Sequence, residues 1–202
     1  MNFAIIAQQL VSGMGSSLMI FVLTLLFSMP LGLLVAFGRM SKIKPLQAVI
    51  KVFIAILRGT PLMLQLLVVN FAPYYLFRIS LPRWYRFAAI IIGFSINYAA
   101  YFAEIYRSGI ESIPKGQYEA ASVLGYNKNQ TFFRIIFPQM VKRVLPPVTN
   151  EVITLVKDTS LAFVLAYEEM FTVAKQIASA RTSIMPLFVA GVFYFIFNGV
   201  VA

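Results

Sequence analysis

An apolar segment near the start of the chain limits its fold more than any other feature. Residues 14–38 carry no charged side chain. As a helix these 25 residues measure about 37 Å, and the hydrocarbon core of a bilayer is about 30 Å thick. Pro30 and Gly32 are tolerated in lipid, where neighbouring helices satisfy the freed backbone groups, and Arg39 follows the segment directly. We therefore expect residues 14–38 to form a first transmembrane helix.

Composition extends this conclusion to the whole chain. Hydrophobic residues make up 60% of it and charged residues only 12%, and its mean hydropathy of +0.82 is typical of a membrane protein. The sequence has no cysteine and no histidine, which excludes disulfides, Cys or His metal sites and histidine-based catalysis. The net charge of +10 comes from short loops beside apolar segments, a pattern that indicates membrane topology in lipid and no nucleic-acid partner.

Four more apolar segments predict a single all-α membrane domain over residues 1–202 with about five transmembrane helices. They cover residues 62–77, 87–106, 146–166 and 184–202. Thr60 and Pro61 form a typical helix start, with Thr60 as the cap and Pro61 in the first position. Residues 45–57, with Lys51 in the middle, are too short to span and are expected to lie at or dip into the interface. The last segment ends without a basic residue, so we expect further residues beyond it.

The longest polar interruption, residues 115–138, predicts two short helices at a sharp angle, hereafter the knob. The first is expected from Gln117 to Leu124, closed by Gly125 in a left-handed conformation. Asn127 and Gln130 have the spacing of a capping box for the second helix, which we expect to end at Pro138 because proline lacks a backbone N–H. Such a polar loop between membrane segments indicates a partner outside the membrane.

The knob also carries a recognisable motif. Glu119, Ala120 and Ala121 are followed after three residues by Gly125 and, nine residues later, by the sequence Ile-Ile-Phe-Pro that ends at Pro138. This motif resembles the EAA loop of the permeases of ABC importers, with Phe137 where leucine is usual. The sequence RGTP at residues 58–61 and residues 103–125 are similar to the polar amino acid branch of that family.

The resemblance implies a type I ABC importer permease fold and a cytoplasmic loop that docks on a separate ATP-hydrolysing subunit. The docking residues would be Gly116, Glu119, Ala120, Ala121, Gly125 and Pro138. Two ATPase copies would bind ATP and Mg, and an extracytoplasmic binding protein would deliver the amino acid. The chain itself has no GxxxxGK[ST] phosphate-binding loop, so we expect no enzyme activity and no cofactor in it.

The fourth apolar segment carries the charges that need a function. At 100° per residue, five polar residues fall within an arc of about 120° and are expected to face the bundle interior; they are Asn150, Glu151, Thr154, Lys157 and Asp158. Lys157 lies about 16 Å along the helix from Pro146, near the middle of the bilayer. A charge at this depth costs several kcal/mol unless it is paired or wet, which favours a pathway or binding site. The alternative is a buried ion-pair network, for example Lys157 with Glu104.

These residues suit an amino acid zwitterion, whose carboxylate and ammonium each need an opposite charge in a water-poor site. Lys157 would hold the carboxylate, Glu151 or Asp158 the ammonium, and Asn97 would add hydrogen bonds. With Glu104 the site has three acids and one base, which favours arginine, lysine or histidine. Because binding proteins usually set specificity in this family, a generic polar pocket, or none, is the alternative.

The function that this sequence supports is a permease subunit of a polar amino acid ABC importer in a prokaryotic inner membrane. Five helices are few for enclosing a pathway, so we expect two copies, or this chain with a close homologue. The alternative is an ion-coupled secondary transporter or proton pathway that uses Glu151, Lys157 and Asp158. It would leave the knob unexplained.

The distribution of basic residues predicts the orientation. If the knob is cytoplasmic, ten Lys and Arg lie in cytoplasmic loops and five outside, in agreement with the positive-inside rule. The cytoplasmic ten are Arg39, Lys42, Lys44, Lys51, Arg107, Lys115, Lys128, Arg134, Lys142 and Arg143; the other five are Arg78, Arg83, Arg86, Lys175 and Arg181. The N-terminus is then outside and the C-terminus in the cytoplasm.

Overall fold

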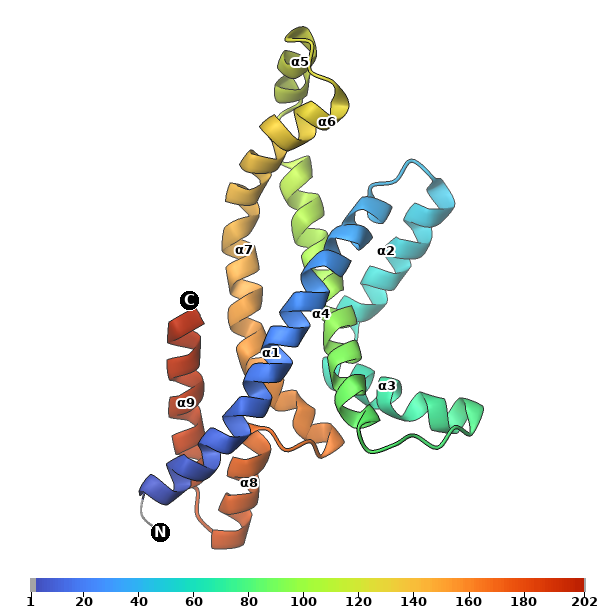
Figure 1. Cartoon of the computed structure of the whole chain (residues 1–202). Helices are drawn as coiled ribbons and strands as arrows, with labels where there is room; N and C mark the ends of the chain where they lie inside the picture. Colours follow the sequence, from blue (N-terminus) through green and yellow to red (C-terminus); the bar gives the residue numbers. More distant parts are fainter. Residues whose placement is uncertain (1–2, 202) are drawn as a thin grey trace.

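The computed structural model describes residues 3–201, and within them it is helical without any strand (Figure 1). The α-helices are α1 (Phe3–Arg39), α2 (Lys44–Gly59), α3 (Leu62–Phe77), α4 (Tyr85–Glu111), α5 (Lys115–Val123), α6 (Lys128–Thr131), α7 (Phe137–Asp158), α8 (Met170–Arg181) and α9 (Met185–Val201). A π-helical turn, Phe132–Ile136, joins α6 to α7, and a 3₁₀ helix, Thr159–Leu165, follows α7.

Helix α4 lies at the centre of the bundle. Its buried residues include Phe94, Tyr98 and Phe102, and α1 is the helix against which it packs most extensively. The two backbones approach closely at Gly32, where a Cβ atom would lie 2.8 Å from the Cβ of Phe102. Glycine is therefore the residue that allows this crossing, and α4 becomes the scaffold for the helices around it.

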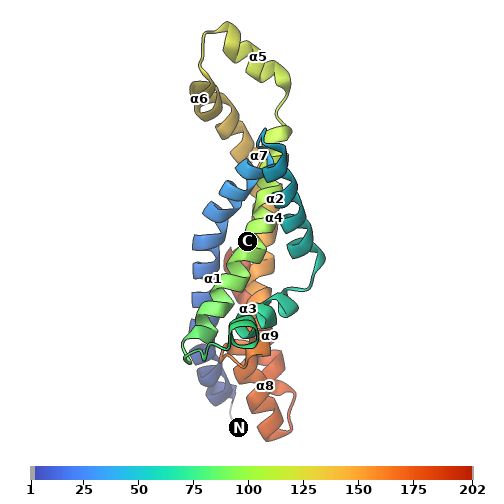
Figure 2. The same ribbon diagram turned by 90° about the vertical axis from the view of Figure 1, so that its right-hand side faces the viewer.

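Helices α1, α2, α4, α7 and α9 run along the long direction of the molecule, whereas α3 lies across it (Figures 1 and 2). By length and composition, α1 from Ile5 and α4 are able to cross a membrane, and so is the pair α2–α3 if it counts as one broken span. Charged residues interrupt α7, and α9 has only 17 residues. Of the fifth predicted segment, Ala202 lies outside the described residues.

The predicted roles of residues 45–57 and 62–77 need correction. Helix α2, expected to lie at or dip into the interface, packs against α1 and α4. Helix α3, expected to be a span of its own, continues from α2 at an angle of 110°. The reason is the break at Gly59 to Pro61, where Thr60 is extended, as residues before proline tend to be. Thr60 does not cap α3, because its hydroxyl donates back to the carbonyl of Ile56.

Two other predicted boundaries also change. Helix α1 begins at Phe3 rather than at residue 14, since no helix breaker stands before Gly13. Helix α7 begins at Phe137 and passes through Pro146 and Pro147, and its α-helical part ends at Asp158 rather than at residue 166. The two carbonyls that lose a donor to these prolines belong to Lys142 and Arg143, which are exposed.

The knob confirms most of its local predictions. Gly125 has φ +74°, and the amides of Gly125 and Tyr126 donate to the carbonyls of Ser122 and Ala121, which is a Schellman ending for α5. Asn127 and Gln130 form the capping box, with N···O distances of 2.9 and 3.0 Å. Pro138 does not end the second helix: it sits in the first turn of α7, where a missing N–H costs little.

Candidate functional site

The hydroxyl of Tyr98 connects the centre of α4 to the end of α7. Tyr98 is 2% exposed, and its hydroxyl donates a hydrogen bond of 2.7 Å to Oδ2 of Asp158. Asp158 is the last residue of α7, and the chain tightens into the 3₁₀ helix directly after it. This contact holds a half-buried carboxylate against the central helix.

A cation of α2 lies over a neighbouring tyrosine of α4. The guanidinium of Arg58 lies 5.1 Å from the ring centroid of Tyr101, and the rings of Tyr101 and Tyr98 are 6.3 Å apart. Arg58 stands in the last turn of α2, where the helix dipole favours a positive charge. Glu151 precedes Asp158 by two turns on α7, so the two carboxylates lie on the same face of that helix. One guanidinium and two carboxylates, carried by α2 and α7, thus gather around two tyrosines.

The predicted polar stripe of α7 divides into two parts. Glu151 and Asp158 are half-buried. Asn150, Thr154 and Lys157 are exposed in this chain, so a single chain does not enclose the whole predicted stripe. Lys157 makes no salt bridge within the described residues 3–201.

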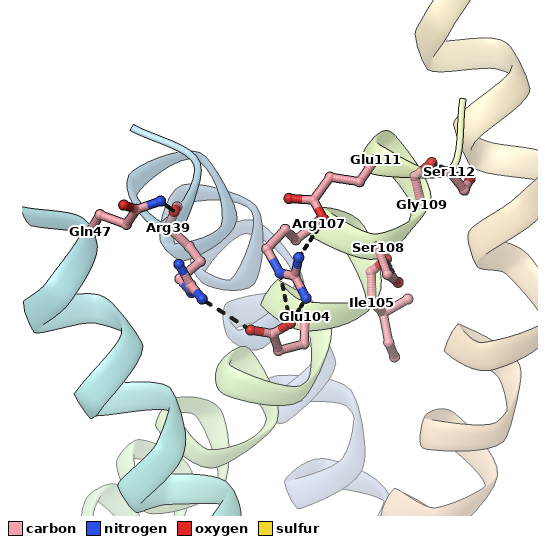
Figure 3. A network of polar contacts seen from close by, with 9 residues as sticks. All are labelled: Arg39, Gln47, Glu104, Ile105, Arg107, Ser108, Gly109, Glu111 and Ser112. Atoms are coloured by element: carbon pink, nitrogen blue, oxygen red, sulfur yellow. Dashed lines mark hydrogen bonds and ion pairs between the residues drawn. The ribbon is translucent and has the colours of Figure 1, made fainter. Parts of the chain in front are cut away.

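Glu104 belongs to a different cluster, at the end of α4 nearest the knob (Figure 3). Its Oε2 lies 2.6 Å from Nη2 of Arg107, and its Oε1 lies 3.9 Å from Nε of Arg39 on α1. Arg107 also pairs with Glu111. The predicted alternative in which Glu104 pairs with Lys157 is therefore wrong: an arginine one turn away on the same helix already neutralises Glu104.

The side-chain amide of Asn97 is hydrogen-bonded to other groups of the protein and is buried. Asn97 is 5% exposed, and its Nδ2 donates to the carbonyl of Leu57 at 3.1 Å and to Oε1 of Gln65 at 2.9 Å.

Arg58 and Tyr98 were not predicted from the sequence as residues of the site. The signal for Arg58 was present, because it is the only charged residue between Lys51 and Arg78.

The knob presents a different surface from the one that its motif suggested. Ala120 is exposed, but Ala121 is fully buried inside the knob. Glu119 is exposed and lies beyond the first turn of α5. The exposed apolar side chains at the tip are Val123, 88% exposed, and Leu124, 72% exposed.

Comparison with known proteins decides what this architecture is. The family model described as "Binding-protein-dependent transport system inner membrane component" matches residues 28–202. The chain belongs to this family. It is a membrane permease subunit of the ABC transporter type, and ATP hydrolysis resides in a separate subunit. The predicted family is confirmed.

Two curated relatives come from Bacillus subtilis. The L-cystine transport system permease protein TcyB is 40% identical over 158 residues, which cover 78% of this chain and 66% of TcyB. The probable amino-acid ABC transporter permease protein YckA is 37% identical over 180 residues, which cover 89% of this chain and 77% of YckA. The chain thus spans about two thirds to three quarters of the length of these relatives.

Solved structures confirm the predicted fold class. The crystal structure of an amino acid ABC transporter with histidines superposes on this chain with a TM-score of 0.88 at 30% identity, covering all of this chain and 94% of that one. The MetNI methionine ABC transporter in an inward-facing conformation gives a TM-score of 0.77 at 17% identity, which supports the fold alone. The fold is that of a type I ABC importer permease.

Proposed function

We propose that this chain carries a polar amino acid through the membrane and that the zwitterion binds between Arg58, Glu151 and Asp158. The observations that carry the proposal are the hydrogen bond of Tyr98 to Asp158, the guanidinium of Arg58 over Tyr101, and the place of Glu151 two turns before Asp158 on α7. In a water-poor site a carboxylate and an ammonium each need a charged partner. Arg58 takes the carboxylate and one of the two acids takes the ammonium.

This assignment revises two roles expected from the sequence. Arg58 replaces Lys157 as the partner of the carboxylate. Both side chains are exposed in the single chain, but the guanidinium of Arg58 lies over the ring of Tyr101, beside Tyr98. Glu104 leaves the site, because Arg107 binds it. One carboxylate remains for the side chain of the substrate, which favours a cationic amino acid. Among the relatives, TcyB is named for L-cystine and ArtQ for arginine.

A second copy of this chain, or a close homologue, is the partner that the exposed half of the α7 stripe supports. Asn150, Thr154 and Lys157 are exposed in the single chain, and lipid does not tolerate such a row of polar side chains. Facing a second permease across a shared pathway, they would be wet. The two copies would then enclose the route that five helices alone do not close.

The remaining partners follow from the two ends of the molecule. The knob, with Val123 and Leu124 exposed at its tip, lies on the cytoplasmic side and docks on an ATPase subunit, one per permease, that binds ATP and Mg. The opposite end, which carries the start of α1 and α8 (Figure 1), faces the extracytoplasmic binding protein. In the cell membrane of a prokaryote, the N-terminus of the chain is then outside the cell and the C-terminus in the cytoplasm.

Energised uptake tests this function. The permease, its ATPase and its binding protein are reconstituted in vesicles, and uptake of labelled arginine, glutamine and cystine is followed with and without ATP. Uptake of one of them that requires ATP and survives a protonophore is expected. Uptake without ATP that a protonophore abolishes would support the ion-coupled alternative and overturn the proposal.

A further inference from the structure

The break between α2 and α3 is held by two amide side chains. Nε2 of Gln65 on α3 donates to the carbonyl of Leu57 at 2.8 Å, the carbonyl of Thr60 at 3.1 Å and the hydroxyl of Thr60 at 2.9 Å. Nδ2 of Asn97 on α4 donates to the same Leu57 carbonyl and to Oε1 of Gln65. The two amides therefore tie the end of α2, the start of α3 and the centre of α4 together at one point.

The carbonyl of Leu57, which both amides bind, is one of those that a helix leaves unpaired at its end. The last carbonyls of α2 have no partner within the helix, and the turn at Thr60 and Pro61 supplies no amide in their place. An unpaired buried carbonyl costs about 1–3 kcal/mol. Gln65 and Asn97 provide the missing donors, so that a bend of 110° exists without that cost.

One face of α4 packs against both sides of the bend between α2 and α3. Gly93, Asn97 and Tyr101 are spaced by four residues and share that face. Leu66 of α3 packs at Gly93, where a Cβ atom would lie 2.8 Å from its Cδ2, and Arg58 of α2 lies over the ring of Tyr101. Asn97 sits between these two contacts and is buried.

We propose that Gln65 and Asn97 are positioning residues that hold Arg58 at the substrate site. This inference rests on the proposed function, because it takes Arg58 as the partner of the substrate carboxylate. Arg58 directly follows the carbonyl that both amides bind. Releasing that carbonyl frees the last turn of α2, and the guanidinium then loses its fixed place over Tyr101. Asn97 contributes to binding through Arg58 and does not contact the amino acid.

Equilibrium binding of labelled L-arginine to the purified permease–ATPase complex, without binding protein, tests the role of the two amides. Asn97→Leu removes both donors of the buried amide, and Gln65→Met serves as a second, half-buried variant if the first does not assemble. Each is expected to raise Kd about three- to tenfold, the effect of losing one or two hydrogen bonds. Ser95→Ala is the matched control, because Ser95 is equally buried on α4 and its hydroxyl has no partner among residues 3–201.

A double-substitution cycle separates positioning from general damage. If Asn97 acts through Arg58, Asn97→Leu weakens arginine binding in the native chain but adds nothing in an Arg58→Lys background. Equal losses in both backgrounds, or a normal Kd in Asn97→Leu, overturn the positioning role.

A distance measurement distinguishes failure of this inference from failure of the proposed function. The chain has no natural cysteine, so spin labels at Ala55 on α2 and Val68 on α3, both exposed, report the bend whether or not substrate binds. Asn97→Leu is expected to broaden their distance distribution, and Arg58→Lys to leave it narrow. A narrow distribution in Asn97→Leu overturns the clamp. If Asn97→Leu broadens the distribution but Arg58→Lys binds arginine as tightly as the native chain, Arg58 is not the partner of the substrate carboxylate. The proposed function of Arg58 then fails, and so does the proposal that the two amides position it at the site.

Discussion

The hydroxyl of Tyr98 reaches across from the centre of the bundle to bind Asp158 at 2.7 Å, at the point where α7 ends. The ring of Tyr98 stacks with that of Phe94 and lies near that of Phe102. The tyrosine therefore has two separate roles, an apolar one in packing and a polar one in fixing the carboxylate.

Replacing Tyr98 by phenylalanine separates these roles. The ring still fills its place, so assembly and thermal stability are expected to stay close to native. Asp158 loses the donor that orients it, and a hydrogen bond to a charged group contributes about 1.5–3 kcal/mol. Arginine binding to the permease–ATPase complex should weaken by about tenfold or more. A native affinity for arginine in Tyr98→Phe would show that the hydrogen bond from Tyr98 does not orient Asp158 for binding.

The two acids near Arg58 predict a difference between substrates. Glu151→Gln and Asp158→Asn are expected to weaken transport of arginine more than that of glutamine, by about 1–3 kcal/mol for the lost charged partner. Uptake of both amino acids into vesicles measures this difference. Equal losses would assign both acids to the α-ammonium or to the fold, and no loss would remove them from the site.

The exposed apolar tip of the knob is predicted to be the surface that docks on the ATPase. Leu124→Ser removes an apolar side chain that is 72% exposed, so folding should change little while docking of the ATPase weakens. Substrate-stimulated ATP hydrolysis and uptake are expected to fall together. Ala121→Leu is the contrasting variant: Ala121 is fully buried, so extra volume there should disrupt the knob itself. Normal uptake in Leu124→Ser would place the docking surface elsewhere.

Orientation is tested by single cysteines in this cysteine-free chain. A cysteine at Lys128 should react only with reagents that enter the cytoplasm, and cysteines at Pro82 and Ser179 should react with impermeant reagents from outside. All three native residues lie in loops or at helix ends away from the charged site. Labelling of position 128 from outside would reverse the topology and move the ATPase away from the knob.

Local signals in the sequence predicted local structure well. The left-handed Gly125 and the capping box of Asn127 and Gln130 depend on residues within one or two turns, and both form as expected. The apolar segments likewise located the start of α3 at Leu62 and the family motif located the knob.

Contacts between distant helices could not be predicted in the same way. Asn97 and Glu104 were expected at the substrate site as polar residues of one apolar segment, but the sequence of that segment does not say which neighbouring helix each of them faces. The 110° break at Pro61 brings α2 back along α4, so Asn97 binds the carbonyl of Leu57 and Arg58 reaches Tyr101. Similarly, Glu104 pairs with Arg107 on α4 itself, and the pattern of polar residues on α7 did not predict this pair.

The role of Arg58 is the central claim, and binding of labelled arginine to Arg58→Gln tests it most directly. The variant keeps a long polar side chain on the exposed end of α2 but removes the only cation that lies over Tyr101 among the described residues. We expect arginine affinity to fall by about tenfold or more, as for loss of a charged hydrogen-bond partner, with the permease–ATPase complex intact. Native affinity in Arg58→Gln would contradict the account.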